Sequence, residues 1–238
     1  MKPRRAATSQ TSKKKRISRT RRILHENGLS IVLLGLFFVF LIGQGIAGHL
    51  QHNQDLQEHG QPAIALEEYL SSDHFLEATA ENWESEFLQM SAYVLLSVFL
   101  YQKGSSESKK PDDHEAVDTV SRRSLKDVPW PVRHGGVISK LYENSLSLVF
   151  LLLFFGSFML HAIAGARLHS KDQELHGKPP ISVSEYLATS RFWFEALQNW
   201  QSEFLAIGSM VFLSIFLRQK GSPESKPVDS PHGQTGKN

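Results

Sequence analysis

Apolar residues are concentrated in four dense blocks along the chain, with polar stretches between them. The first block, Leu29 to Ala47, contains no charged side chain, and the third, Leu146 to Ala166, is interrupted only by serines and His161. As helices rising about 1.5 Å per residue, both come close to the roughly 30 Å thickness of a bilayer core. The pattern therefore predicts that both blocks are transmembrane helices.

The second and fourth blocks, Phe87 to Tyr101 and Phe204 to Leu217, are shorter. About fifteen residues make roughly 22 Å of helix, which is too short to span a bilayer. A Gln-Lys-Gly triplet follows each block and indicates a helix end with a C-cap glycine, Gly104 or Gly221. We therefore expect each helix to extend at its amino end, which draws in Asn82, Trp83 and Glu86, and likewise Asn199, Trp200 and Glu203.

The chain contains an internal repeat. A shift of 117 positions aligns residues 24–110 with residues 141–227 without a gap, and about 40 of roughly 87 pairs are identical. The strongest match pairs NWESEFL, which starts at Asn82, with NWQSEFL, which starts at Asn199. Because each copy holds two spans, the chain enters both copies from the same side, and the repeats are parallel. The sequence thus predicts an all-α fold with four transmembrane helices in two parallel helix-loop-helix repeats.

Two other interpretations of the apolar blocks agree less well with the sequence. Surface helices of a soluble bundle would carry charges every three or four residues, and these blocks do not. The first block could be a signal peptide, because basic residues precede it and small residues lie near its end. The third block is the same segment in the second copy, where no signal peptide could lie, so we expect both to be retained as spans.

Composition divides the chain into five parts. The segment between the repeats is rich in Ser, Lys and Asp and poor in apolar residues, which is typical of disorder. The expected parts are a basic cytoplasmic tail (1–22), repeat 1 (23–104, spans about 29–47 and 83–101), a disordered cytoplasmic linker (105–138), repeat 2 (139–221, spans about 146–166 and 200–218) and a disordered tail (222–238).

The distribution of Lys and Arg predicts the orientation. Ten lie before the first span, eight lie between Gln102 and Lys140, and four follow the last span, whereas the two long loops hold none and four. Positive charge favours the cytoplasmic side, so both termini and the linker are expected there and the long loops outside. Trp83 and Trp200 would then anchor the helices at the outer interface, where tryptophan is enriched.

Each outer loop carries a histidine and aspartate pattern ahead of a Gly-x-Pro turn. Offsets of three and seven place these side chains on one helix face, and His with carboxylate suits zinc or a similar metal. A solvated helix that stops at Gly60 or Gly177 explains the same residues without a metal. The candidate ligands are His52, Asp55 and His59 in the first copy, and His169, Asp172 and His176 in the second.

A short helix is expected to follow each turn, at Tyr69-Leu70 and Tyr186-Leu187. Ser72 or Ser190 would cap the long helix that comes next, because a serine side chain can accept from the free N–H groups of a first turn.

Polar residues near the outer helix ends are the second candidate site. Carboxylates at the hydrocarbon edge are costly unless paired or hydrated, and such groups often line ion or proton paths. Hydrogen bonding between helices would explain them equally well. The candidate polar path consists of Glu86, Glu203, Asn82, Asn199, Gln44 and His161.

Other functional classes receive little support. The chain has no cysteine, which excludes thiolate chemistry and disulfides, and no basic surface with interleaved aromatics indicates nucleic-acid binding. We expect no cofactor. The basic run at Lys13 to Arg16 could bind anionic lipid or simply enforce topology. The expected partners are the lipid bilayer and a second copy of the chain.

Several motifs together resemble a known family. The openings ENGLS and ENSLS, the turns EHGQP and LHGKP, the NWESEFLQM and NWQSEFLAI segments and the ending RQKGSPESKP are similar to those of bacterial membrane proteins grouped as domain of unknown function 6766. The resemblance covers nearly all of the chain except the basic amino-terminal tail. It implies a small protein of the bacterial inner membrane, and it assigns no activity and no functional residues. This agrees with the multi-pass topology and cytoplasmic termini expected from the apolar blocks and the charges.

The expected function is accordingly broad. The leading hypothesis is a non-enzymatic structural or envelope accessory protein. The second is a small channel or transporter that uses Glu86 and Glu203, and an enzyme with a metal on its outer face is the third.

Overall fold

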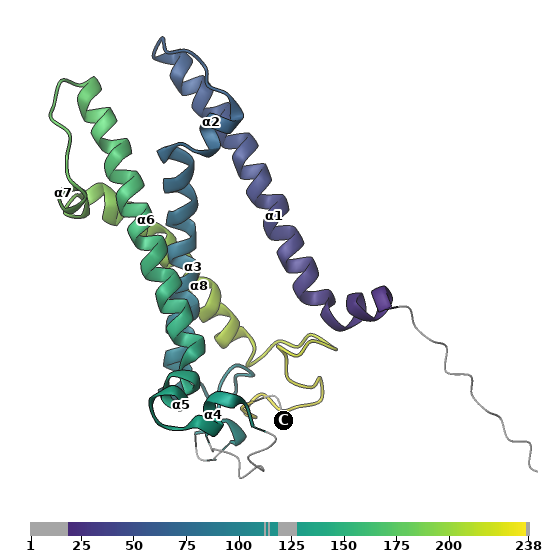
Figure 1. The fold of residues 1–238 in the computed structure, drawn as a ribbon. Helices are drawn as coiled ribbons and strands as arrows, with labels where there is room; N and C mark the ends of the chain where they lie inside the picture. Colours follow the sequence, from purple (N-terminus) through teal and green to yellow (C-terminus); the bar gives the residue numbers. More distant parts are fainter. Residues whose placement is uncertain (1–18, 112, 114, 119–127, 237–238) are drawn as a thin grey trace, which may run out of the picture. The chain divides into compact units, whose positions relative to one another are not determined.

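The computed structural model describes residues 19–111, 113, 115–118 and 128–236, and all regular structure within these ranges is helical (Figure 1). The all-α class is therefore confirmed. The elements are α1 (Arg19–Glu58), α2 (Leu66–Leu70), α3 (Asp73–Phe99), the 3-10 turn η1 (Ala116–Asp118), α4 (Trp130–His134), α5 (Gly136–Glu143), α6 (Ser145–Leu175), α7 (Val183–Leu187) and α8 (Ser190–Leu213).

The described helices include two, α1 and α6, that are long and apolar enough to cross a membrane. Helix α1 is kinked at Asn27, whose backbone leaves helical geometry, and then continues without interruption to Glu58. Its large side chains are strongly exposed, with Leu33 at 56% and Phe40 at 68%. A soluble protein seldom leaves an apolar surface of this extent uncovered.

The chain divides into two compact units, Met1–Leu66 and Glu67–Asn238. In the first unit the segment after α1 folds back along the helix end. The Asn53 side chain accepts from the N–H of Ile64 at 2.8 Å and donates to the carbonyl of Ile64 at 3.0 Å. Gly60 adopts φ 70°, a left-handed conformation that favours glycine, and it ends α1 as the sequence predicts.

In the second unit α3 lies along α6 and, less extensively, along α8. Ala162, Ala166, Tyr186 and Phe192 form its most deeply buried apolar core, where α6, α7 and the start of α8 meet. Small alanines on α6 allow the aromatic rings to approach the helix closely. The core therefore fixes the position of α7 against α6.

Local capping explains where the long helices begin. Ser72 caps α3 by accepting from the N–H of Phe75, as expected, whereas Thr189 rather than Ser190 caps α8 by accepting from Phe192. The prediction of Ser190 was wrong by one position. Either hydroxyl residue can cap a helix, and the one that has the extended backbone conformation of an N-cap is Thr189.

The long helices end earlier than predicted, and Gly104 and Gly221 do not serve as their C-caps. Helix α3 ends at Phe99 and α8 at Leu213. After α8 the Arg218 guanidinium donates to the carbonyls of Ser214, Ile215 and Leu217 at 2.8 to 3.2 Å. The last carbonyls of α8 accept from backbone N–H groups beyond its end: Ser214 donates to Met210 at 3.1 Å and Leu217 donates to Leu213 at 2.9 Å, so α8 ends without a glycine cap.

Parts of the expected disordered segments have defined structure. Within residues 130–143 lie α4 and α5, whose N-cap positions are Pro129 and Gly135, and residues 112, 114 and 119–127 of the linker lie outside the described residues. The tail through Gly236 forms turns against the segment after α3. Lys226, only 1% exposed, donates to the carbonyls of Gly104, His232 and Gln234. A buried ammonium with several carbonyl acceptors has the partners that it needs.

Candidate functional site

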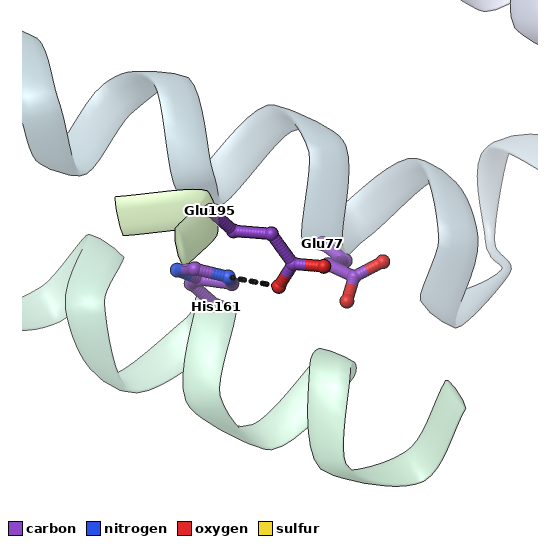
Figure 2. A group of neighbouring side chains, drawn as sticks. All are labelled: Glu77, His161 and Glu195. Carbon is purple, nitrogen blue, oxygen red and sulfur yellow. Dashed lines mark ion pairs between the residues drawn. The ribbon is translucent and has the colours of Figure 1, made fainter. Parts of the chain in front are cut away.

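A buried polar cluster lies where α3, α6, α7 and α8 meet, and we call it the acid-histidine cluster. It consists of Glu77 and Glu84 on α3, His161 on α6, Tyr186 on α7 and Glu195 on α8. Figure 2 shows the side chains of Glu77, His161 and Glu195 gathered between their helices. Four separate helices therefore contribute to one site.

His161 and Glu84 form the most buried pair of the cluster. Nδ1 of His161 lies 3.1 Å from Oε2 of Glu84, and both side chains are 0% exposed. The other carboxylate oxygen of Glu84 accepts from the indole N–H of Trp200 at 3.2 Å. A carboxylate oxygen accepts, so we assign the proton of this bond to Nδ1 of His161. The pair thus fixes the orientation of the imidazole ring.

Glu195 is held from several sides. Its Oε2 accepts from the Tyr186 hydroxyl at 2.8 Å, and its Oε1 accepts from Nε of Arg191 at 2.9 Å. The same hydroxyl lies 3.4 Å from Oε1 of Glu77, which brings the second carboxylate into the cluster. The two carboxylates therefore share one tyrosine.

The second ring nitrogen of His161 faces this carboxylate pair. Nε2 lies 3.6 Å from Oε2 of Glu195, a contact marked in Figure 2. That distance allows attraction between charges but is too long for a hydrogen bond, and Nε2 is buried without a hydrogen-bond partner. One ligand atom each from Glu77, His161 and Glu195 lie within 4.8 Å of one another.

The surroundings of Glu77 and Glu195 shift the pKa values of these two carboxylates in opposite directions. Burial and the nearby charge of Glu195 raise the pKa of Glu77 to about 7. Burial opposes ionisation of Glu195 as well, but His161, Tyr186 and Arg191 outweigh it and lower the pKa of Glu195 to about 2. Both residues precede the expected spans. Separation of this kind is common at functional sites and also occurs in structural ion-pair networks.

A close approach at Gly165 positions Tyr186. A Cβ atom at Gly165 would lie 2.5 to 2.7 Å from the tyrosine ring and hydroxyl, which no side chain tolerates without a shift. The absence of a side chain on α6 lets the ring reach Glu195. Phe192 packs on the same ring in an edge-to-face arrangement at 5.6 Å.

The residues of the predicted polar path lie in different surroundings. His161 belongs to the cluster, and Asn199 adjoins it because its side-chain amide donates to Glu81 on α3. Asn82 is exposed and donates back to the carbonyl of Ala78 at 2.7 Å. Gln44 lies on α1 and is half-buried.

Glu86 and Glu203 lie close enough for their charges to repel. Glu86 is exposed and Glu203 is half-buried, and the Gln89 amide donates to the backbone carbonyl of Glu203 at 3.1 Å. The acid that contacts His161 is therefore Glu84 rather than Glu86.

The candidate loop ligands have local partners. Nδ1 of His59 lies 2.7 Å from the Asp55 carbonyl, and Nδ1 of His176 lies 2.8 Å from the Asp172 carbonyl and 3.7 Å from its carboxylate. Nε2 of His169 contacts the Gln173 amide at 3.1 Å, and His52 lies half-buried on α1. Within the described residues, the set that could share a metal ion is Glu77, His161 and Glu195 instead.

The two predicted interface tryptophans differ. Trp83 is 36% exposed, whereas Trp200 is half-buried and donates to Glu84. Trp200 thus contacts the cluster directly. The prediction of lipid binding at the basic tail falls mainly on residues 1–18, which lie outside the described residues.

Sequence reasoning did not single out Glu77, Glu84, Tyr186 and Glu195 as one site. A signal was present: 117 positions away stand Phe194 for Glu77, Gln201 for Glu84, and Ala78 for Glu195. Charged residues that occur in one copy only are candidates for a site formed once. The matching motifs directed attention to the glutamates found in both copies.

The chain belongs to the family described as Domain of unknown function (DUF6766), which matches residues 20–237. This agrees with the resemblance seen in the sequence motifs. No curated protein and no solved structure matches the chain.

Proposed function

We propose that the chain is a multi-pass protein of the bacterial inner membrane, with four spans in two parallel repeats and with both termini and the linker in the cytoplasm. Its role is non-enzymatic: the outer loops bind a partner protein or lipid, and the acid-histidine cluster holds α3, α6 and α8 together. One observation carries the proposal. His161 and Glu84 are 0% exposed and bonded to each other, which favours a structural site over one open to substrate.

Two further features support the membrane assignment. Apolar side chains are exposed along α6 and α8 as well as along α1, for example Leu152 at 71% and Leu205 at 71%. Such surfaces suit a lipid environment, in which helices satisfy all of their own backbone hydrogen bonds. The excess of Lys and Arg outside the two long loops supports the proposed orientation.

Topology can be tested cleanly because the chain has no cysteine. Single variants Gln61→Cys and Lys178→Cys probe the two outer loops, and Asp113→Cys is the matched control in the linker. A membrane-impermeant maleimide applied to intact spheroplasts should label the first two and spare the third. Recovery of the protein in a salt-washed, detergent-free supernatant, or labelling of Asp113→Cys, would contradict the proposal.

The same two loop cysteines test the proposed role. Coupled to a photoreactive cross-linker, they should capture a protein or a lipid at the outer face. Asp113→Cys should not capture the same molecule. If the loops capture neither protein nor lipid, a role in partner binding fails even where the topology holds.

A proton or ion path is the second candidate, and the acidic face of α3 favours it. Glu77, Glu81 and Glu84 follow one another at helical spacing and contact Tyr186, Asn199 and His161 in turn. Consecutive ionisable groups between helices are typical of proton relays in membranes.

Proteoliposomes with an internal pH dye test this second candidate. Glu84→Gln should abolish any proton flux, whereas the double variant Glu86→Gln with Glu203→Gln should retain it if the cluster is the path. Flux absent from the wild type would eliminate the candidate. Loss of proton flux in the double variant alone would indicate that the path uses Glu86 and Glu203 instead of the cluster.

A further inference from the structure

We propose that Glu77, His161 and Glu195 bind a divalent transition-metal ion of the Zn²⁺ class. This inference concerns a ligand of the acid-histidine cluster and depends neither on the membrane topology nor on the proposed role of the loops. The donor set suits such an ion. One imidazole nitrogen and two carboxylates are ligands that zinc accepts, and their atoms already lie within 4.8 Å of one another.

One ring nitrogen of His161 has no hydrogen-bond partner. His161 is fully buried, and its Nε2 points toward Glu195 with no hydrogen bond of its own (Figure 2). Since Nδ1 carries the proton shared with Glu84, a neutral ring presents a lone pair at Nε2 to the carboxylate. A lone pair facing an anion is repulsive unless a cation lies between them. That cation is either a second proton on the ring or a metal ion.

The surroundings of His161 on its Nδ1 side support metal binding as well. Metal-bound histidines commonly donate their other N–H to a carboxylate, which fixes the tautomer and the ring orientation. Glu84 occupies that position at 3.1 Å, and Trp200 in turn donates to Glu84. The arrangement that prepares a ring for metal binding is thus complete on the Nδ1 side.

The Tyr186 hydroxyl and the Arg191 guanidinium define the remaining surroundings. Tyr186 donates to Oε2 of Glu195, the oxygen nearest His161, and Arg191 donates to Oε1. A metal ion on Oε2 would take over the role of the tyrosine proton and leave Arg191 in place. The two ligand carboxylates balance the charge of a divalent ion.

Ligand type also indicates which ions would be rejected. Calcium and magnesium require six or more oxygen ligands or several retained waters, and a buried set of one nitrogen and two carboxylates does not offer them. The site therefore selects Zn²⁺ or Co²⁺ over Mg²⁺ and Ca²⁺.

The experiment uses the full-length chain in detergent, without a histidine tag, stripped with a chelator and titrated with ZnCl₂ by calorimetry. The wild type should bind one Zn²⁺ per chain, and Co²⁺ should give the absorption bands of a low-coordinate site. Glu77→Gln, which preserves the shape of a ligand, should abolish both signals. Glu84→Gln should weaken binding by about 10- to 100-fold, because it removes only the supporting carboxylate.

His176→Ala is the matched control, because this exposed histidine lies 3.7 Å from a carboxylate. It should bind zinc as the wild type does. Binding below about 0.1 ion per chain in the wild type would overturn the proposal, and so would full binding by Glu77→Gln. Loss of binding in His176→Ala would place the ion in the outer loop instead. Folding of each variant is checked by circular dichroism, and Glu77→Gln decides if Glu84→Gln does not fold.

Discussion

The turn that follows α1 and the turn that follows α6 have aligned sequences and the same local hydrogen bonds, but the residues near them differ in chemistry. Asn53 holds Ile64 by both backbone groups, and at the aligned position Ser170 holds Ile181 in the same way, at 3.0 and 3.1 Å. Tyr69 and Tyr186 are both buried. Either asparagine or serine can therefore occupy this position of the turn, because each side chain reaches both backbone groups of the isoleucine that follows.

The surroundings of the two tyrosines are different. The Tyr69 hydroxyl lies 3.3 Å from Nδ1 of His74, whereas the Tyr186 hydroxyl donates to Glu195. Position 44, aligned with His161, is glutamine, and position 78, aligned with Glu195, is alanine. Charged residues therefore stand at one set of the aligned positions, whereas the two turns are alike. The acid-histidine cluster can accordingly be altered without changing the residues that hold the turns.

The largest effect is expected at Glu84. Glu84→Ala leaves Nδ1 of His161 and the Trp200 indole without an acceptor inside the protein. Breaking a buried pair in this way costs about 3–5 kcal/mol. The aligned change Gln201→Ala, at an exposed position, should alter stability by less than about 0.5 kcal/mol. Denaturation in detergent followed by circular dichroism measures both, and equal losses would remove the contrast between the copies.

The next largest effect is on the pH dependence of stability, to which Glu77 and Glu195 should contribute with opposite signs. The pKa of Glu77 is raised to about 7, so its protonated form favours folding, and stability falls as the pH rises from about 4.5 through 7. Glu77→Gln should remove that fall and gain on the order of 3 kcal/mol over the wild type above pH 8.

Glu195 is the internal control for that experiment. Its pKa is lowered to about 2, so its contribution is present above about 4.5 and is lost as the pH falls toward 2. Glu195→Gln should therefore be less stable than the wild type at neutral pH. Melting temperatures of metal-free protein from about pH 2 to about pH 9 measure both slopes, and parallel slopes for the two variants would contradict the assignment.

A steric test at Gly165 comes third. Gly165→Ala places a Cβ atom 2.5 Å from the Tyr186 ring and should cost about 2 kcal/mol, the middle of the range for overpacked cores. Gly156 on the same helix has nothing within 4 Å, so Gly156→Ala should stabilise by up to about 1 kcal/mol. Thermal unfolding of the two variants side by side checks the prediction. A stable Gly165→Ala protein would mean that Tyr186 can move aside.

The smallest effect compares the two tyrosines directly. Tyr186→Phe removes a hydrogen bond to a carboxylate at 2.8 Å, and Tyr69→Phe removes a longer contact with a histidine. Bonds to charged groups contribute more than neutral ones, so the first variant should be less stable than the second by about 1 kcal/mol. Chemical denaturation resolves such a difference. Equal losses would indicate that Glu195 does not depend on the hydroxyl.

Local features were predictable from the sequence and distant ones were not. The helix stops at Gly60 and Gly177 depend on a single backbone conformation, with φ 70° and 69°, and the residues show it directly. The helix at Trp130 carried a similar signal, a proline at its first turn, but the polar composition around it favoured a linker. The cluster could not be found in this way, because its five members come from four helices and meet only when those helices pack.

Lys226 has a consequence for how the helices can move. Its ammonium ties the segment after α8 to the carbonyl of Gly104 after α3, and the Ser105 and Ser214 hydroxyls meet 2.8 Å apart beside it. These contacts hold the carboxyl ends of α3 and α8 together, whereas the acid-histidine cluster lies nearer the amino ends of the two helices. Any motion that admits an ion to the cluster would therefore separate the amino ends of these two helices, while the contacts of Lys226 keep their carboxyl ends together.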